Sequence, residues 1–228
     1  MKEKAKMELP VRIELVLFAL VNSKLKVGVL PVAGDKFHLP LVEIIPQKDN
    51  NLKSAAQRQI KNLKLTCRYL EQTQTLGEKK VQGKGWTISI VYFGLLAPFE
   101  EEKETCLQWL TLEQALQQKW EANEVLAIKE SWQRLKSKSL YTSLPLFLLP
   151  FEFTLTELQK IYENILGFKI EKKSFRRRLL DADLLRETGK ERRASHRPAQ
   201  LYQVFASDLY FFSRIIEGAR EKAKALNH

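Results

Sequence analysis

The sequence has few side chains that form disulfides or bind metals. Its two cysteines, Cys67 and Cys106, are too few for a disulfide framework and have no metal-ligating neighbours. This pattern is typical of a reduced cytosolic protein. The three histidines, His38, His196 and His228, are scattered along the chain and indicate no zinc site. We therefore expect no bound metal and no other cofactor.

Long hydrophobic runs are also missing. No run approaches the roughly 18 apolar residues that a membrane-spanning helix needs. Lysines near the N-terminus followed by residues 15–21 superficially suggest a signal peptide, but Arg12 and Glu14 interrupt the segment and no clear cleavage site follows. We interpret residues 15–21 as a buried strand, and we expect a soluble cytoplasmic protein with no membrane partner.

Positive charge is what the sequence has in excess. Its 228 residues include 38 Lys and Arg against 27 Asp and Glu, which gives a formal net charge of +11. Such a balance favours a polyanionic partner such as nucleic acid or an acidic membrane surface, although many basic proteins of this size are merely soluble. Residues 169–197 alone contain eleven Lys and Arg against five Asp and Glu. More than half of the net charge is therefore concentrated in one short segment.

The sequence changes character twice along its length. Residues 1–98 and 151–228 are basic, with net charges of +8 and +5, whereas residues 99–150 carry −2. Near the end of this acidic middle, Pro145 and Pro150 bracket a short apolar run, and proline interrupts both helices and strands. We therefore predict two domains, residues 1–145 and 146–228, which together have an α+β fold.

The first domain combines β-rich runs with amphipathic segments. The residues Asn22-Ser23 between the first two runs favour a hairpin, and Thr111 with Gln114 forms a capping box that opens a helix. The predicted strands cover residues 12–21, 25–30, 69–76 and 86–96. The predicted helices cover residues 52–63, 112–119 and 123–139, where apolar residues recur with helical spacing.

The second domain is mostly helical. Thr154 and Glu157 form a capping box, and Gly167 ends the helix that they begin. A second helix is predicted over residues 173–184, and Gly189 is expected to break the chain again. A strand over 200–205 and a final helix over 207–226, capped by Ser207, complete the domain.

Basic side chains lie on one side of the second predicted helix. If Phe175 points into the core, a rotation of about 100° per residue places Leu179 on the same buried face and turns Lys173 and Arg177 away from it. Arg176, Arg178 and Ser174 flank this front. A basic helical front fits the major groove, where arginine can donate two hydrogen bonds to guanine. The alternative is a solvated charged face with no partner.

A basic loop follows this helix and is predicted to be the wing of a winged helix-turn-helix. Arginines of a wing contact phosphates or the minor groove, whereas Pro198 fixes the backbone. The helix and the loop together predict a double-stranded DNA operator as the partner. The candidate DNA-binding residues are Lys172, Lys173, Ser174, Arg176, Arg177, Arg178, Lys190, Arg192, Arg193 and Arg197.

With these segments, the sequence resembles the Nudix-related transcriptional regulators that control NAD or sugar metabolism in bacteria. The family usually has Asn where this chain has Ser174. The resemblance extends to about residue 204 and is specific in the winged-helix part but weaker before it. It implies a Nudix-like α/β/α sandwich followed by a C-terminal winged helix-turn-helix. The segments that carry it are residues 153–159, 161–163, 172–177 and 197–202, and, in the first domain, 39–40, 69–72 and 75–77, with Leu52, Ala55, Ala56 and Arg58.

The chemistry of a Nudix hydrolase is missing from the corresponding helix. Such enzymes hold Mg²⁺ with carboxylates that follow an arginine. In this sequence Gln59, Asn62 and Leu63 stand at those positions, and Leu41 and Val42 replace the glycines of the preceding turn. We therefore predict no catalytic residues and no hydrolase activity. Two nearby glutamates, Glu43 and Glu71, are interpreted as surface or structural residues.

The resemblance implies ADP-ribose or a related phosphorylated sugar as a small-molecule effector. Lys79 and Lys84, in a Gly- and Lys-rich loop, could approach its phosphates, and Trp86 could stack on a base. A solvated hairpin tip beside a core tryptophan explains these three residues better. They are therefore weak ligand candidates, and a different effector, or none, is compatible with the sequence.

The favoured function is a homodimeric DNA-binding regulator, most simply a repressor, since two recognition helices must span two half-sites. Two alternatives from other classes remain. One is a Nudix-type hydrolase of nucleoside diphosphate derivatives with an appended nucleic-acid-binding module. The other is a basic scaffold that binds RNA or a partner protein.

Overall fold

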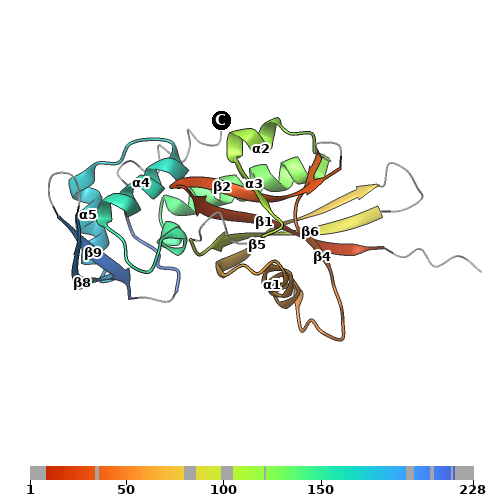
Figure 1. Cartoon of the computed structure of the whole chain (residues 1–228), viewed down its shortest axis with the longest axis horizontal. Helices are drawn as coiled ribbons and strands as arrows, with labels where there is room; N and C mark the ends of the chain where they lie inside the picture. The colour runs from red at the N-terminus through yellow and green to blue at the C-terminus, as the bar shows by residue number, and fades with distance from the viewer. Residues whose placement is uncertain are drawn as a thin grey trace, which may run out of the picture. The chain divides into compact units, whose positions relative to one another are not determined.

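The computed structural model in Figure 1 describes residues 9–33, 36–79, 86–98, 105–120, 122–193, 198–205, 208–216 and 218. The chain divides into two compact units. The first consists of residues 1–18, 26–96 and 102–131, and the second of residues 19–25, 97–101 and 132–228. The domain boundary at residues 145/146 stays a prediction. No helix within the described ranges is long and apolar enough to cross a membrane.

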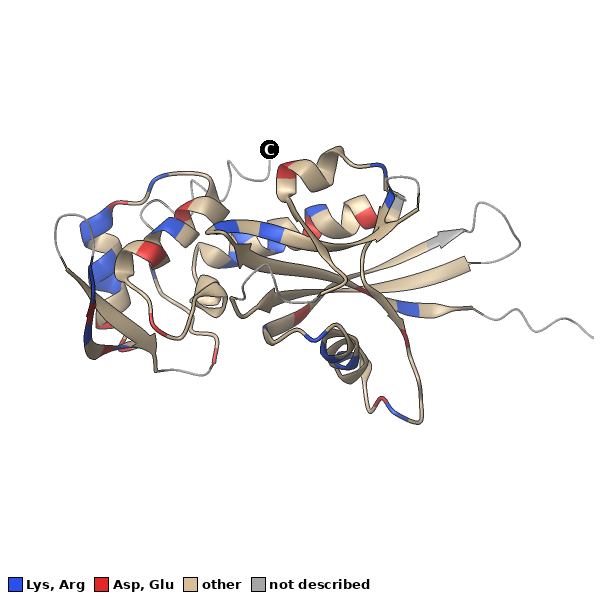
Figure 2. Cartoon of the chain, viewed as in Figure 1, with Lys and Arg blue, Asp and Glu red and all other residues tan. Residues whose placement is uncertain are grey.

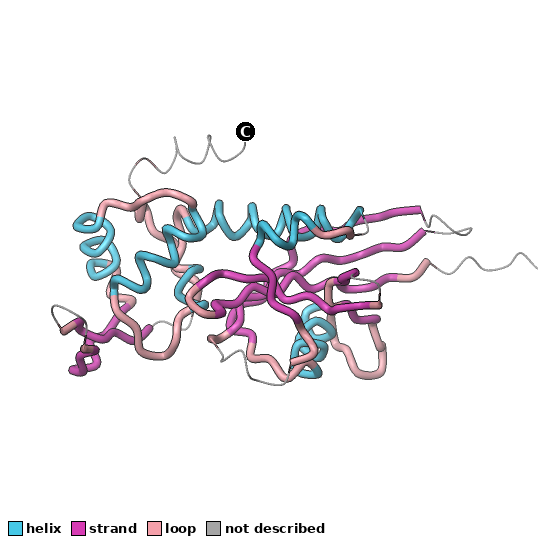
Figure 3. The backbone as a smooth tube through the Cα atoms, turned by 45° about the horizontal axis from the view of Figure 1, so that its top comes forward, coloured by secondary structure: helices cyan, strands magenta, loops and turns pink. Residues whose placement is uncertain are grey.

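The first unit is built on a mixed sheet of seven described strands (Figure 3). The main path runs β3-β2-β1-β6-β5, with β4 paired to β1 and β7 to β2. Central β1 pairs in parallel with β6, and its residues from Leu15 to Leu17 are fully buried, as expected for a strand covered on both faces. The strands are β1 (Val11–Val21), β2 (Lys24–Val32), β3 (Lys36–His38), β4 (Leu41–Glu43), β5 (Cys67–Lys79), β6 (Trp86–Leu96) and β7 (Gln108–Thr111).

The turn between β1 and β2 confirms the predicted hairpin connection. Asn22 and Ser23 have φ angles of 52° and 61°. Two consecutive residues with positive φ are the signature of the two-residue turn whose twist matches that of the flanking strands. The predicted strands over 69–76 and 86–96 are also confirmed, as parts of the antiparallel pair β5–β6.

Helices lie on both faces of this sheet. Helix α1 (Leu52–Asn62) packs against β4 and β5, whereas α3 (Ala122–Ser139) lies on the other face (Figure 3). The short α2 (Leu112–Gln117) begins at the predicted capping box, where Thr111 Oγ1 accepts a hydrogen bond from the backbone of Gln114. The predicted α/β/α layers are therefore confirmed.

The second unit contains a helix-turn-helix and a β-hairpin. The capping box at Thr154 and Glu157 opens α4 as predicted, and Gly167, with φ of 79°, ends it in the left-handed conformation. A two-residue bridge between Phe153 and Tyr202 attaches the hairpin to the segment before α4. The elements are η1 (Leu144–Leu148), α4 (Leu155–Leu166), α5 (Lys172–Asp181), β8 (Leu185–Arg192) and β9 (Ala199–Val204).

Aromatic side chains hold the two helices together. The rings of Tyr162 on α4 and Phe175 on α5 meet edge to face with their centroids 5.0 Å apart, and both side chains are fully buried. The Tyr162 hydroxyl donates to the backbone oxygen of Thr142 over 2.7 Å. The ring contact fixes the orientation of α5, because the buried face of α5 packs on Tyr162, which the hydrogen bond to Thr142 holds in place.

Two predicted features of this unit differ in the structure. The second helix ends at Asp181 rather than at residue 184, because the buried Leu184 and Leu185 lead into β8 instead. Gly189 does not break the chain. With φ of 73° it lies in a register shift of the β8–β9 ladder, and the strand continues through it. Glycine tolerates the positive φ that a bulge of this kind requires.

The predicted final helix over residues 207–226 is wrong for the part that can be described. Residues 208–216 form no helix. Their backbone bonds instead to the end of the α3–η1 connection: Phe212 N donates to Tyr141 O over 2.8 Å, and Ser143 N donates to Tyr210 O over 2.9 Å. The rest of the predicted helix lies outside the described residues, apart from Gly218. Backbone groups of this segment form their hydrogen bonds with a distant segment, where a helix would have formed them locally.

Candidate nucleic-acid interface

Helix α5 is fixed at its first turn by Glu171. Its carboxylate accepts hydrogen bonds from the backbone nitrogens of Lys173 and Ser174, at 2.9 and 2.6 Å. The bond from Ser174 is the main reason why the pKa of Glu171 falls to about 2. The N-terminus of α5 therefore carries its own anion at neutral pH, and these two N–H groups are not available for a phosphate.

The front of α5 carries the two cations that the helical wheel predicts, Lys173 and Arg177, and Lys172 in its first turn is exposed as well. Phe175 and Leu179 are fully buried, whereas Lys172, Lys173 and Arg177 are exposed. Figure 2 shows the basic residues gathered on this helix. Among the described residues, the side chains of these three cations have no hydrogen-bonding or ion-pairing partner. Their donors are therefore available to an outside ligand.

The two flanking arginines are engaged within the unit. Arg176 donates to Thr156 Oγ1 on α4 over 2.8 Å, and its buried Nε has no partner. Arg178 donates to the backbone oxygen of Ile215 over 3.4 Å. Both side chains are half-buried, as is Ser174. The structure thus separates the predicted cluster into outward cations and cations that tie α5 to its surroundings.

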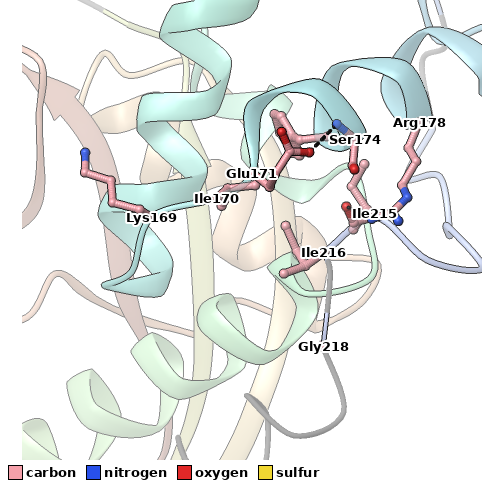
Figure 4. A pocket seen from close by; sticks show the side chains of 9 residues that line it. Lys169, Ile170, Glu171, Ser174, Arg178, Ile215, Ile216 and Gly218 are labelled. Carbon is pink, nitrogen blue, oxygen red and sulfur yellow. Dashed lines mark hydrogen bonds between the residues drawn. The ribbon is translucent and has the colours of Figure 1, made fainter.

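A cavity of about 400 Å³ lies beside the first turns of α5 (Figure 4). Its floor is apolar and includes Ile170 and Ile216, while Ser174 and Arg178 contribute polar groups to its lining. The guanidinium of Arg178 lies next to Ile215 in this view. The cavity is therefore lined jointly by α5 and by Ile215, Ile216 and Gly218.

The wing cations are also divided. Lys190 on β8 forms an ion pair with Glu152 at 2.7 Å, and Arg192 forms one with Glu157 at 2.5 Å. Arg193 is exposed, and no partner for it occurs in the described part of the chain. Arg197 lies outside the described residues.

In the first unit, Arg58 has a structural role. Its guanidinium donates to both carboxylate oxygens of Asp49, at 2.8 and 2.7 Å, and to the backbone oxygen of Glu43 at 2.9 Å. This hydrogen-bonded pairing lowers the pKa of Asp49 to about 2. The arginine thereby ties α1 to the loop before it.

The face of α1 that would carry carboxylates in a hydrolase has none. Gln59 is half-buried, Asn62 is exposed and Leu63 is buried. Of the two glutamates weighed as substitutes, Glu43 is exposed and Glu71 accepts a hydrogen bond from the Tyr69 hydroxyl. Within the described ranges, no group of three or more His, Cys, Asp or Glu is arranged to hold a metal ion.

Two buried carboxylates escaped the sequence analysis. Glu124 on α3 accepts from the backbone nitrogen of Leu39 over 2.7 Å, and burial raises its pKa. Glu14 on β1 accepts from Arg12 and Ser89, and its second oxygen is buried without a partner. Glu14 is followed by seven apolar residues of the same strand, which is the signal that could have marked it as a buried polar residue.

The weak ligand candidates lie at the edge of the described residues or beyond it. The Trp86 side chain is 52% exposed, so it is not the core tryptophan of the alternative interpretation. It begins β6 opposite Lys79, whose side chain lies outside the described part, as does Lys84 entirely. The three residues therefore remain predictions.

A cavity of about 390 Å³ between α1 and the start of β5 was not predicted. Three of its lining residues, Lys53, Lys61 and Arg68, are cations. Lys53 and Lys61 lie two helical turns apart on one side of α1, so their spacing was a usable signal. Electrostatically the groove suits an anion rather than a metal ion.

A capped helix-turn-helix, a bridged β-hairpin and an outward row of cations define a winged-helix protein of the DNA-binding class, here preceded by a Nudix-like unit. Comparisons with known proteins agree. The family model of the NrtR DNA-binding winged helix domain matches residues 145–204. The chain is 37% identical over 180 residues to the ADPR responsive transcriptional repressor NtrR of Acinetobacter baylyi. The matched residues make up 76% of this chain and 72% of that protein.

Solved structures give the same result. The structure of Shewanella oneidensis NrtR complexed with a 27mer DNA matches with a TM-score of 0.80 and 31% identity, over 91% of this chain and 99% of that one. A MutT/nudix family protein from Enterococcus faecalis shares the fold, with a TM-score of 0.68 at 16% identity over 88% and 90% of the two chains. The chain belongs to the NrtR family of Nudix-related transcriptional regulators, which confirms the resemblance.

Proposed function

We propose that this protein is a transcriptional repressor that binds an operator through α5 and the β8–β9 wing. The observation that carries the proposal is the exposed row of Lys172, Lys173 and Arg177 on a rigidly capped helix. The description of one relative as a repressor and the DNA complex of another support it. Exposed arginine and lysine on such a helix match the hydrogen-bond acceptors of guanine in the major groove.

Within this interface we assign different roles to the cations. Arg177 reads a base in the major groove, and Lys172 and Lys173 contact phosphate or guanine. Arg176 and Arg178 hold α5 in position through hydrogen bonds to Thr156 and Ile215, and contact with DNA is not their main role. The wing contributes backbone contacts, with Arg193 the free cation among those described and Arg197 as a further candidate.

We further propose that the protein acts as a cytoplasmic homodimer, with residues 1–145 as the sensing and dimerisation domain and 146–228 as the DNA-binding domain. The effector would be ADP-ribose or a related phosphorylated sugar, because one relative is described as ADPR responsive. Binding of effector and operator would then be coupled through two dimer geometries with different half-site spacing.

We propose that the Nudix-like unit does not hydrolyse nucleoside diphosphate derivatives. Gln59, Asn62 and Leu63 leave α1 without the carboxylates that hold Mg²⁺. The alternative, a hydrolase with a nucleic-acid-binding module, predicts release of phosphorylated products from ADP-ribose in the presence of Mg²⁺. Measurable turnover by the purified chain would favour that alternative and overturn the sensor assignment.

Selection of bound sites from random duplex DNA tests the DNA-binding proposal directly. Enrichment of one sequence is expected, after which Arg177→Ala should lower affinity for that operator by about 1–3 kcal/mol while affecting random duplex much less. Arg193→Ala is the matched control, because loss of a phosphate contact weakens binding to every sequence. Equal losses on both duplexes for Arg177→Ala would refute its role as a base reader.

A further inference from the structure

Two acidic residues at the start of α4 form ion pairs with cations of the wing. Glu157 lies in the first turn of α4 and pairs with Arg192, and Glu152 lies just before that helix and pairs with Lys190. Arg192 also donates to the backbone oxygen of Glu152 over 3.3 Å. The partners are 35 to 40 residues apart in sequence. Both pairs therefore depend on the folded hairpin.

Exposure decides how strong these pairs are. The side chains of Arg192 and Glu157 are 46% and 40% exposed, and those of Lys190 and Glu152 are 66% and 28% exposed. Exposed ion pairs in water change an equilibrium constant by roughly 1.4- to fivefold. The pairs are thus strong enough to be populated and weak enough to be exchanged. A DNA backbone, with one negative charge per roughly 1.7 Å of duplex, is a competing anion of much higher charge density.

We propose that Glu152 and Glu157 are intramolecular competitors of DNA, occupying the wing cations Lys190 and Arg192 until phosphates take their place. This inference rests on the proposed function, since it presumes that the wing meets a duplex. When phosphates replace the two glutamates, the protein loses both ion pairs, whatever the sequence of the DNA. Because phosphates carry no sequence information, affinity for operator and non-operator duplex is lowered by the same factor. The two glutamates therefore limit non-specific retention, while α5 alone sets the preference for the operator.

Glu157→Gln tests the proposal without disturbing the helix. Glu157 Oε2 accepts from the backbone nitrogen of Thr154 over 2.8 Å, and glutamine serves equally at this position of a capping box. The variant should bind both operator and random duplex roughly 1.4- to fivefold more tightly at low salt, with an unchanged ratio between them. Glu152→Gln should act in the same direction through Lys190. Dissociation constants from fluorescence anisotropy of labelled duplexes give the readout.

Glu191→Gln is the matched control for charge. Glu191 lies on β8 between the two paired cations, is exposed, and forms no ion pair among the residues that can be described. The same loss of one negative charge should produce a clearly smaller gain there. In an Arg192→Gln background, Glu157→Gln should add nothing beyond the gain seen with Glu191→Gln, since the competing pair is already absent.

Two results would overturn the proposal. One is an equal gain from Glu157→Gln and Glu191→Gln, and the other is a gain from Glu157→Gln that persists in full without Arg192. If either occurs while Arg177→Ala still weakens operator binding selectively, the proposed function stands and only the competition is refuted. A wild-type protein that binds no duplex refutes both.

Discussion

Replacement of Tyr162 by phenylalanine removes one hydroxyl from the core beneath α5 and leaves its ring in place. The hydroxyl donates to the backbone oxygen of Thr142 over 2.7 Å, and both residues are fully buried. Its loss leaves a buried acceptor without this donor, which costs about 1–3 kcal/mol of unfolding free energy. The edge-to-face contact with Phe175 is retained, so α5 should keep its orientation.

The same hydroxyl gives the stability a predictable dependence on alkaline pH. Burial raises the pKa of Tyr162 far above its ordinary value of 10.0. Below pH 10 the phenol is neutral in both states. Above it the unfolded chain releases the proton while the folded chain keeps it, so the folded state loses up to about 1.4 kcal/mol of stability per pH unit. Tyr162→Phe lacks this loss, so its deficit at pH 7 should shrink as the pH rises from 10 to 11.

Urea unfolding followed by circular dichroism at pH 7, 10 and 11 provides the measurement. Tyr141→Phe is the control, because the Tyr141 side chain is 43% exposed and its hydroxyl should contribute nothing measurable. Equal stability of wild type and Tyr162→Phe at pH 7 would show that the bond to Thr142 is energetically silent. A deficit that stays constant up to pH 11 would refute the titration argument.

Two further predictions concern the two units separately. Gly167→Ala should destabilise the second unit by about 1–2 kcal/mol, because φ of 79° is strained for alanine although no atom lies within 4 Å of the added Cβ, and an unchanged unfolding midpoint would contradict this. In the first unit, the Asp49–Arg58 pair should stabilise at neutral pH and be lost as the pH falls from about 4 through about 2, since the pKa of Asp49 drops from 3.8 to about 2. Asp49→Asn should remove that part of the acid sensitivity, and urea unfolding at pH 7 and pH 3 compares the two proteins.

Several parts of the second unit were predictable because their signals are local. The capping box at Thr154 and Glu157 and the terminal Gly167 lie within the helix that they delimit. The buried positions of Phe175 and Leu179 follow from helical periodicity alone. The end of α5 did not follow, because residues 182–184 have helix-compatible side chains but form the turn that leads into β8, in which Asp183 has a φ of 51°.

The segment after residue 207 shows the limit of that reasoning. Its apolar spacing fits a helix, but its described part pairs with residues 141–143, some seventy positions earlier in the chain. The spacing of apolar residues within one segment contains no information about a pairing segment so far away in the sequence. The loss of carboxylates from α1, in contrast, is a property of residue identity and needed no structure to be seen.

The sequence by itself determined that a capped helix is followed by a second helix with a basic front, because capping and periodicity act over a few residues. Tertiary structure alone decided which cations of that cluster remain free. Arg176 meets Thr156, Arg178 meets Ile215, and Arg192 meets Glu157, across 20, 37 and 35 residues. Only folding brings such partners within hydrogen-bonding distance, so the division between outward and engaged cations could not be derived from charge counts.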